Sequence, residues 1–314
     1  IVLPFSVDEF RATSVDIRED GRWGERFERL LEDANDVLVV SEQPPDGCPS
    51  AYEYANIVMT GLARLRAQLL DTRLQGLAVW DGTDSGEPGG TGSVVKTWRD
   101  SGVPVDHVQV GNEAPHAATG AIPGAAANAD RPWPFSYSIE SMLFADAVGY
   151  SRLSEQQIPA FFEHYAGAIA SLNSVTDHPA NHVETAGDGM YMVFNDPGAA
   201  GHFALELIEL INDRDWREVG LPEDLGIRVG LHSGPVFVAT DPITRQTLYS
   251  GVHTSRTARI EPITPPGQVY ASSAFAAVAT ANNADGLRFS YIGRTQLAKH
   301  YGVLPLYHVK LARP

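Results

Sequence analysis

Two aspartates, Asp146 and Asp188, are the side chains in this sequence best suited to chemistry. Each lies where an apolar strand pattern gives way to a turn of small residues, so the two carboxylates could meet at adjacent strand ends. Hard cations such as Mg²⁺ prefer carboxylate oxygens and usually keep bound water, so two carboxylates and the phosphates of a substrate make a sufficient site. An aspartate beside glycine is also common as a turn or cap residue. The pair, more than either member, predicts metal-assisted phosphate chemistry.

The elements that must position this pair lie in residues 135–314. Helical and strand-like patterns alternate there, which predicts an α+β domain with an antiparallel-containing sheet, flanking helices and the two aspartates at one end of the sheet. The expected order is a strand at SMLFAD, a helix over about 154–172, strands at HVETAG and MYMVF, a helix over 197–213, separate strands at IRVGLHSG and PVFVAT, a helix from about Thr254, a strand at QVYAS and a terminal hairpin.

The preceding residues, 1–111, predict a second domain of the α/β class. Apolar runs at 36–40, 76–80 and 106–110 are typical of buried strands, and helical spacing from Tyr54 to Leu70 lies between the first two. This alternation favours a Rossmann-like parallel layer. If residues 135–314 carry the chemistry, this domain would have a sensory or regulatory role. A glycine-rich loop after the second strand leads into a helix near Ser93; it lacks phosphate-loop spacing and could be a ligand-sensing loop or an ordinary connection.

The segment 112–134 separates the two predicted domains. It is rich in Ala, Gly and Pro and has no sustained apolar period, which indicates a linker. The chain opens on Ile1 in the middle of an apolar pattern and without Met, so we expect that residues upstream of it are missing.

Composition and net charge argue against several classes of protein. The formal net charge is −16, which argues against a nucleic-acid surface because phosphate backbones are bound by clustered Lys and Arg. The lone cysteine, Cys48, excludes an intramolecular disulfide framework and fits a reducing compartment. There is no signal-peptide pattern and no apolar run long enough for a membrane span. These features predict a cytoplasmic protein.

Five ordered segments of the second domain resemble the catalytic domain of class III nucleotide cyclases, the adenylyl and guanylyl cyclase family. Several segments in the right order and spacing are far more specific than one motif, and the resemblance covers roughly Phe135 to the C-terminus. It implies the family's cyclase fold, with a ferredoxin-like core. The segments are LFADAVGYSRLS, VETAGDGMYMVF, IRVGLHSGPVF, GVHTSRTARIEP and IGRTQLAKHYGVLPLYHV.

The resemblance implies which residues bind the metal ions and which act on the reacting nucleotide. Asp146 and Asp188 match the aspartates that bind two Mg²⁺ or Mn²⁺ ions, with the backbone carbonyl of Ala147 as a further ligand. Arg259 matches the arginine that stabilises charge in the transition state. Ser255 stands where the family usually has an asparagine that orients the ribose, so a shorter hydroxyl replaces it.

The positions expected to bind the substrate are less regular. Lys299 aligns with the lysine that contacts the terminal phosphates. Glu184 stands where adenylyl cyclases have lysine; an ionised carboxylate can accept from both N1–H and the amine of guanine, which favours GTP. Its usual partner falls at Leu248, which supplies no hydrogen bond, and a shift of register by one residue would bring Thr247 or Tyr249 to that place.

The resemblance also implies a homodimer in which each site is shared. The aspartates would come from one protomer, and Glu184, Ser255, Arg259 and Lys299 from the other. The expected activity is conversion of a nucleoside triphosphate to a 3′,5′-cyclic nucleotide and pyrophosphate. Adenylate cyclase activity, pyrimidine cyclase activity in phage defence, and a catalytically degenerate nucleotide-binding module remain alternatives.

Three histidines have no catalytic role in this interpretation. His232 lies in an apolar strand pattern and is expected to be a core residue, whereas His253 is expected to shape the loop before the helix of Arg259. His182 is close to Glu184 in sequence, but spacing names no partner for it. No serine, histidine and aspartate pattern with a nucleophile elbow occurs, so covalent acyl chemistry has no support.

Overall fold

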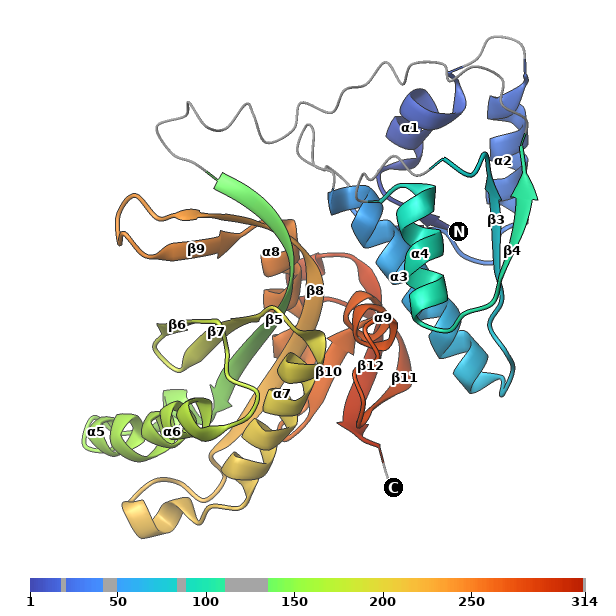
Figure 1. Cartoon of the computed structure of the whole chain (residues 1–314). Coiled ribbons are helices and arrows are strands. Elements are labelled where there is room, and N and C mark those ends of the chain that lie inside the picture. Colours follow the sequence, from blue (N-terminus) through green and yellow to red (C-terminus); the bar gives the residue numbers. More distant parts are fainter. Residues whose placement is uncertain (18–20, 42–49, 84–88, 111–134, 313–314) are drawn as a thin grey trace. The chain divides into compact units, whose positions relative to one another are not determined.

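The computed structural model describes residues 1–17, 21–41, 50–83, 89–110 and 135–312. The chain divides into two compact units, Ile1–Tyr137 and Ser138–Pro314, which are described here one by one (Figure 1). The segment 112–134, predicted to be a linker, and most of the glycine-rich loop lie outside the described residues.

The first unit contains parallel strand pairs and helices, as the α/β prediction requires. Strands β1 and β2 form one parallel pair and strands β3 and β4 another, and no strand links the two pairs within the described ranges. The Rossmann-like continuous sheet is therefore not seen in this part of the chain. The elements are β1 (Val2–Leu3), α1 (Val7–Phe10), α2 (Trp23–Asp33), β2 (Leu38–Val39), α3 (Ser50–Leu69), β3 (Gly76–Trp80), α4 (Thr91–Asp100) and β4 (Val105–Gln109).

The prediction that these strands are buried is largely wrong. In β3 only Gly76 and Ala78 are buried, while Leu77 and Val79 are exposed, and most of β4 is exposed as well. Successive side chains of a strand point to opposite faces of the sheet. If other elements cover only one face, every second side chain remains exposed to solvent. The apolar runs in the sequence therefore mark strands here without marking burial on both faces.

The second unit is built on one mixed sheet with the strand order β11-β12-β10-β8-β5-β7-β6, and β9 pairs with the far end of β8. Strands β5, β7 and β6 pair antiparallel, whereas β10 runs parallel to β8. The elements are β5 (Phe135–Val148), α5 (Ile158–Ala160), a π-helical turn (Phe161–Ala166), α6 (Gly167–Val175), β6 (His182–Ala186), β7 (Gly189–Phe194), α7 (Pro197–Asn212), β8 (Gly226–Thr240), β9 (Thr247–Ser250), α8 (Val252–Ile260), β10 (Val269–Ser272), α9 (Ser273–Ala281), β11 (Leu287–Gln296) and β12 (Val303–Leu311).

This order confirms the predicted α+β class and most of its elements, with one clear correction. The two strands expected on either side of Gly234–Pro235 are one continuous strand, β8. Proline usually interrupts a sheet because it lacks an N–H donor. Here Pro235 lies between the residues paired with β10, which end at Leu231, and those paired with β9, which begin at Phe237, so the missing donor disturbs neither ladder.

Two elements were not expected from the sequence. Helix α9 is rich in alanine and starts at Ser272, whose hydroxyl accepts a hydrogen bond from the backbone N–H of Phe275 at 3.0 Å. This is a standard helix N-cap. Strand β9 is only four residues long and is defined by its pairing with β8, which a local sequence pattern cannot reveal.

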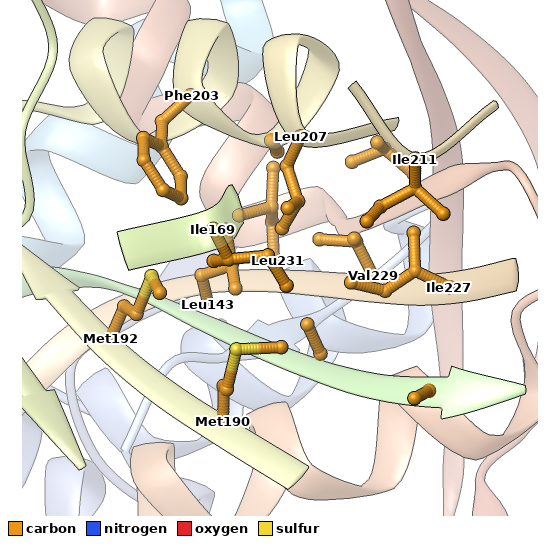
Figure 2. Close-up of a cluster of buried hydrophobic side chains, with 14 of the residues drawn as sticks. Leu143, Ile169, Met190, Met192, Phe203, Leu207, Ile211, Ile227, Val229 and Leu231 are labelled. Atoms are coloured by element: carbon orange, nitrogen blue, oxygen red, sulfur yellow. The ribbon is translucent and has the colours of Figure 1, made fainter. Parts of the chain in front are cut away.

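The main core of the second unit lies between the sheet and the helices α6, α7 and α9. Figure 2 shows the apolar side chains of α7 lying over those of β5, β7 and β8. Phe203, Leu207 and Ile211 follow helical spacing on α7 and are almost fully buried. The burial of so many aliphatic groups makes this face of the sheet a rigid platform. The opposite face carries a smaller cluster around Met142, Tyr191 and Val236.

Candidate active site

The two aspartates meet at one end of the sheet. Asp146 lies near the end of β5 and pairs with Gly189, the first residue of β7, while Asp188 lies in the turn just before it. Gly187 in this turn has a φ of +65°, a conformation that favours glycine and allows the strands to reverse within two residues. The chain reversal therefore brings Asp188 beside Asp146.

The two carboxylates lie close enough for the charge of Asp146 to affect the pKa of Asp188. The pKa of Asp188 is raised, first by partial burial and then by the negative charge of Asp146. Arg228 on β8 offsets part of this charge, because its Nη2 donates a hydrogen bond of 2.9 Å to Oδ2 of Asp146. The site thus holds more negative charge than its own arginine neutralises.

A third carboxylate, Glu261, lies on the other side of Arg228. Its Oε1 is 3.1 Å from Nε of Arg228, close enough for an ion pair although the two groups are not aligned for a hydrogen bond. Burial, followed by the charge of Asp146, raises the pKa of Glu261 to about 7. Arg228 therefore lies between acidic residues from two parts of the chain.

These groups fit divalent cations that also contact a substrate. Within the described ranges, no set of three His, Cys, Asp or Glu side chains converges closely enough to form a complete metal site. Mg²⁺ is commonly held by one or two carboxylates together with water and substrate phosphates, so an incomplete protein site is what such a role needs. Asp146 and Asp188 could hold the ions, and Ala147 follows directly on β5, buried in the main core.

The position expected to recognise the base lies on β6. Glu184 is 44% exposed, and its Oε1 lies 2.8 Å from Nε2 of His182, whose side chain is only 12% exposed. The imidazole ring of His182 in turn packs against the ring of Tyr249, with 5.1 Å between the ring centres. The structure therefore supplies the partner of His182 that sequence spacing did not: it is Glu184 itself.

Leu248 does not take part in this group within one chain. Tyr249 packs against the Met142 cluster and His182, and side chains alternate along a strand, so Leu248 on β9 points away from that face. Of Leu248 and its two neighbours on β9, it is Tyr249 that contacts His182, the partner of Glu184.

The remaining predicted residues gather around α8 and the turn between β11 and β12. Ser255 is exposed on α8, and Arg259 near the end of the helix has its guanidinium carbon 5.9 Å from the ring centre of Tyr301. The Nε atom of Arg259 is buried and has no hydrogen-bond partner among the described residues. Lys299 is exposed in the turn that contacts α8, two residues before Tyr301 in the chain.

No hydrogen bond or ion pair within the described part of the chain joins the aspartates to Glu184, Ser255, Arg259 or Lys299. The predicted site residues therefore form separate groups in one chain. Sequence analysis missed Arg228 and Glu261, although both lie inside motif segments, because their role depends on pairing between β8, β5 and the end of α8.

The other two histidines form a buried pair, as expected for His232. Its Nε2 is 2.8 Å from Nδ1 of His253, and its Nδ1 is 2.6 Å from Oγ of Ser272. The rings stack with centres 5.1 Å apart. Burial lowers the pKa of both, that of His253 to about 3, so both stay neutral near pH 7. His253 lies in the first turn of α8, the helix that carries Arg259, so the expectation that it shapes a loop before this helix is wrong: its buried ring packs into the core from the helix itself.

No helix in the described ranges combines the length and apolar character needed to cross a membrane.

A mixed sheet covered by helices, with two carboxylates converging at one end, has the form of an α+β catalytic domain for phosphate chemistry. The model of the adenylate and guanylate cyclase catalytic domain matches residues 136–304, more than half of the chain. The chain therefore belongs to this family, the class III nucleotide cyclases.

Individual relatives are more distant. The chain is 27% identical over 184 residues to the pH-sensitive adenylate cyclase MT1302 of Mycobacterium tuberculosis, covering 58% of this chain and 43% of that protein. It thus spans less than half of the length of this curated relative. Solved structures with a similar fold include the adenylyl cyclase CyaB from P. aeruginosa (16% identity, TM-score 0.49, 57% of this chain and 97% of that one) and the guanylate cyclase domain of RhGC from Catenaria anguillulae (21% identity, TM-score 0.47, 57% and 100%).

Proposed function

We propose that this protein is an active, divalent-cation-dependent cyclase that converts a nucleoside triphosphate to a 3′,5′-cyclic nucleotide and pyrophosphate. The single observation that carries the proposal is the convergence of Asp146 and Asp188 at the ends of β5 and the β6–β7 turn. A surplus of negative charge at that point suits cations that a triphosphate brings with it.

In the proposed reaction the ribose 3′-oxygen attacks the α-phosphorus in line with the leaving group. A bond from O3′ to the α-phosphorus forms, the bond from that phosphorus to the bridging oxygen breaks, the 3′-hydroxyl proton is released, and pyrophosphate leaves. Bound Mg²⁺ or Mn²⁺ would supply Lewis acidity for both oxygens. The role of Asp146 and Asp188 is to hold the ions, and that of Arg228 is to keep Asp146 oriented in their absence.

The cationic side chains near α8 would act on the phosphates. We assign Arg259 to the charge that grows on the α-phosphate in the transition state, and Lys299 to the terminal phosphates. The buried Nε of Arg259, which has no partner among the described residues, is consistent with a group whose acceptor is supplied by a ligand or a second subunit. Ser255, exposed on the same helix, would donate one hydrogen bond to the ribose.

A homodimer would join the separate groups into complete sites. We propose that Asp146 and Asp188 of one protomer face Glu184, Ser255, Arg259 and Lys299 of its partner, because a two-fold pair of such surfaces creates two equivalent clefts. The separation of these groups within one chain supports this arrangement.

GTP is the substrate that we propose from Glu184, because an exposed carboxylate can accept from the adjacent N1–H and amine donors of guanine. The relative from M. tuberculosis is named an adenylate cyclase, so ATP is the principal competitor. We further propose that the protein acts in the cytoplasm and that the unit Ile1–Tyr137 regulates the catalytic unit.

The decisive experiment is incubation of the purified chain with each of the four nucleoside triphosphates and Mn²⁺ or Mg²⁺, followed by mass spectrometry of the products. We expect a 3′,5′-cyclic nucleotide and pyrophosphate in equal amounts, with cGMP formed fastest. Formation of cAMP alone would refute the choice of GTP. Nucleotide binding in a dimeric preparation with no product from any of the four would refute the enzyme and favour a degenerate binding module.

A further inference from the structure

We propose that His182 is a positioning residue for base recognition, which holds Glu184 in the orientation that reads the base, with Tyr249 supporting the imidazole from behind. This inference rests on the proposed function of Glu184 and extends it to two residues that no motif of the sequence marks. It makes a partly buried histidine, and not Leu248, the second determinant of nucleotide preference.

The hydrogen bond between the two side chains fixes the direction of the carboxylate. Nε2 of His182 is 2.8 Å from Oε1 of Glu184. An ionised carboxylate only accepts, so Nε2 carries the hydrogen and donates it. Because a charged acceptor makes this bond stronger than a neutral one, Glu184 is held in one rotamer with Oε2 left for a ligand.

The side chains of His182 and Glu184 differ in their exposure to solvent, and this difference indicates different roles. The side chain of His182 is 12% exposed and that of Glu184 is 44% exposed. A ligand approaching β6 can therefore reach the carboxylate, while the imidazole stays shielded behind it. His182 acts through Glu184 and has little exposed surface of its own to offer a base.

The aromatic residues around this pair restrict its movement. The ring of Tyr249 lies 5.1 Å from that of His182, and Tyr191 is the direct cross-strand neighbour of Glu184. The hydroxyl of Tyr191 lies 3.3 Å from Oγ1 of Thr254, on the first turn of α8. The rigid setting of this group means that the carboxylate is oriented before a nucleotide binds, which is the condition for strong discrimination between bases.

Two substitutions of His182 test the hydrogen bond to Glu184 and the packing of the ring against Tyr249 separately. His182→Gln places an amide N–H near the position of Nε2 and keeps the donor, whereas His182→Phe keeps a ring against Tyr249 and removes the donor. The measured quantity is the ratio of kcat/KM between the preferred nucleotide and the next best one. A general loss of folded protein scales both values equally and leaves this ratio unchanged.

We expect His182→Phe to lower the ratio by about tenfold or more, mainly through KM, which corresponds to about 1.4 kcal/mol of lost discrimination. His182→Gln should keep most of the ratio. His178→Phe is the matched control, because His178 is another partly buried histidine in ring contact, but it lies in the loop before β6 and its ring partner is His202 on α7. It should leave the ratio unchanged.

The same variants are also tested for equilibrium binding of fluorescent analogues of the four triphosphates in the presence of Ca²⁺. If no cyclic product forms from any nucleotide, the proposed enzyme fails, but the binding ratios still test His182. The inference is overturned if the wild type does not discriminate between bases, if His182→Phe keeps the ratio, or if Leu248→Ala lowers it while His182→Phe does not.

Discussion

At the scale of single residues, the site is an arrangement of charges that is unfavourable for the folded protein by itself. Asp188 is held beside Asp146, and Glu261 adds a further carboxyl group, with Arg228 as the cation between them. Such strain is common where binding of a ligand restores the balance. Stability and activity should therefore respond in opposite directions to changes here.

The first prediction concerns Asp188→Asn. Because burial and Asp146 raise the pKa of this carboxyl group, its ionised form destabilises the folded state at any pH above that pKa. We expect the melting temperature of the variant to exceed that of the wild type at pH 7.5, and the difference to shrink as the pH falls through the raised pKa of Asp188, where the wild-type carboxyl takes up its proton. Cyclase activity should fall by about 100-fold or more.

Differential scanning calorimetry at several pH values and a product assay measure both effects. Asp177→Asn, at an exposed position in the loop before β6, is the control that should change neither. A lower melting temperature for Asp188→Asn at pH 7.5 would contradict the charge argument.

The second prediction concerns the buried pair His232 and His253. Burial lowers both pKa values, so the unfolded chain takes up protons near pH 6.5 while the folded chain does not. Stability from these groups is complete above about pH 6.5 and is lost as the pH falls. Each histidine should reduce the free energy of unfolding by about 1.4 kcal/mol per pH unit below that value.

Urea unfolding between pH 5 and pH 8 measures this slope. His253→Gln removes one titrating group and should reduce the slope between pH 6.5 and pH 5 by the contribution of one histidine, about 1.4 kcal/mol per pH unit. Glu261, whose pKa is raised to about 7, contributes with the opposite sign in this range and does so equally in the wild type and the variant. An unchanged slope would show that the pair does not stay neutral in the folded state.

At the scale of elements, the packing of α8 on β8 decides where Glu261 and Arg259 lie. A Cβ atom on Gly230 would approach the backbone nitrogen of Glu261 to 2.6 Å, so the end of α8 can lie against β8 only because this residue is glycine. Gly226, four residues earlier on the same strand, has room: a Cβ there would lie 3.8 Å from Cβ of Val148.

The third prediction uses this matched pair of glycines. Gly230→Ala forces α8 away from β8 and should lower the free energy of unfolding by about 1–3 kcal/mol, the usual cost of overpacking. It should also reduce activity, because Glu261 and Arg228 lose their contact. Gly226→Ala should be close to neutral in both measurements. Chemical denaturation curves decide the point, and equal stability of the two variants would show that the close approach is not required.

At the scale of the whole molecule, no hydrogen bond or ion pair between described residues joins the aspartates to Glu184, Ser255, Arg259 or Lys299. The aspartates lie at the end of β5, while Arg259 lies beside Tyr301 and Lys299 stands two residues before Tyr301 in the chain. The shared site that we propose for a homodimer would account for this separation, and it also predicts which defects one subunit can correct in the other.

The fourth prediction is complementation between two inactive chains. Asp188→Ala and Arg259→Ala should each be inactive alone, because every site in either homodimer lacks one essential group. A mixture that exchanges subunits should recover activity, since a heterodimer contains one site with both groups intact. Random exchange would restore about a quarter of wild-type activity, because half of the dimers carry one good site of two.

Differential tags and native mass spectrometry confirm that heterodimers form. If they form and the mixture remains inactive, the shared arrangement is wrong. The double variant that carries both substitutions in one chain is the control: mixed with wild type, it should contribute no complete site, because the intact groups then lie on a single chain.

Much of this architecture could be predicted from the sequence because it depends on local patterns. Helical spacing on α7, the strand patterns of β6 and β7, and the turn chemistry around Gly187 act over a few residues. The two aspartates could be predicted to meet because each stands where a strand pattern gives way to a turn of small residues, although the pairing of β7 with β5 that brings them together is a feature of the tertiary structure. The order of elements and the family motifs follow from the same local information.

Only the tertiary structure decided which distant groups share a charge or a hydrogen bond. Arg228 reaches Asp146 because β8 lies next to β5, and Glu261 reaches Arg228 because α8 ends over β8. His182 and Tyr249 touch because β9 folds back on β8. These contacts depend on strand order and on the path of the chain between strands, which involve interactions across many tens of residues and leave no periodic signal in the sequence.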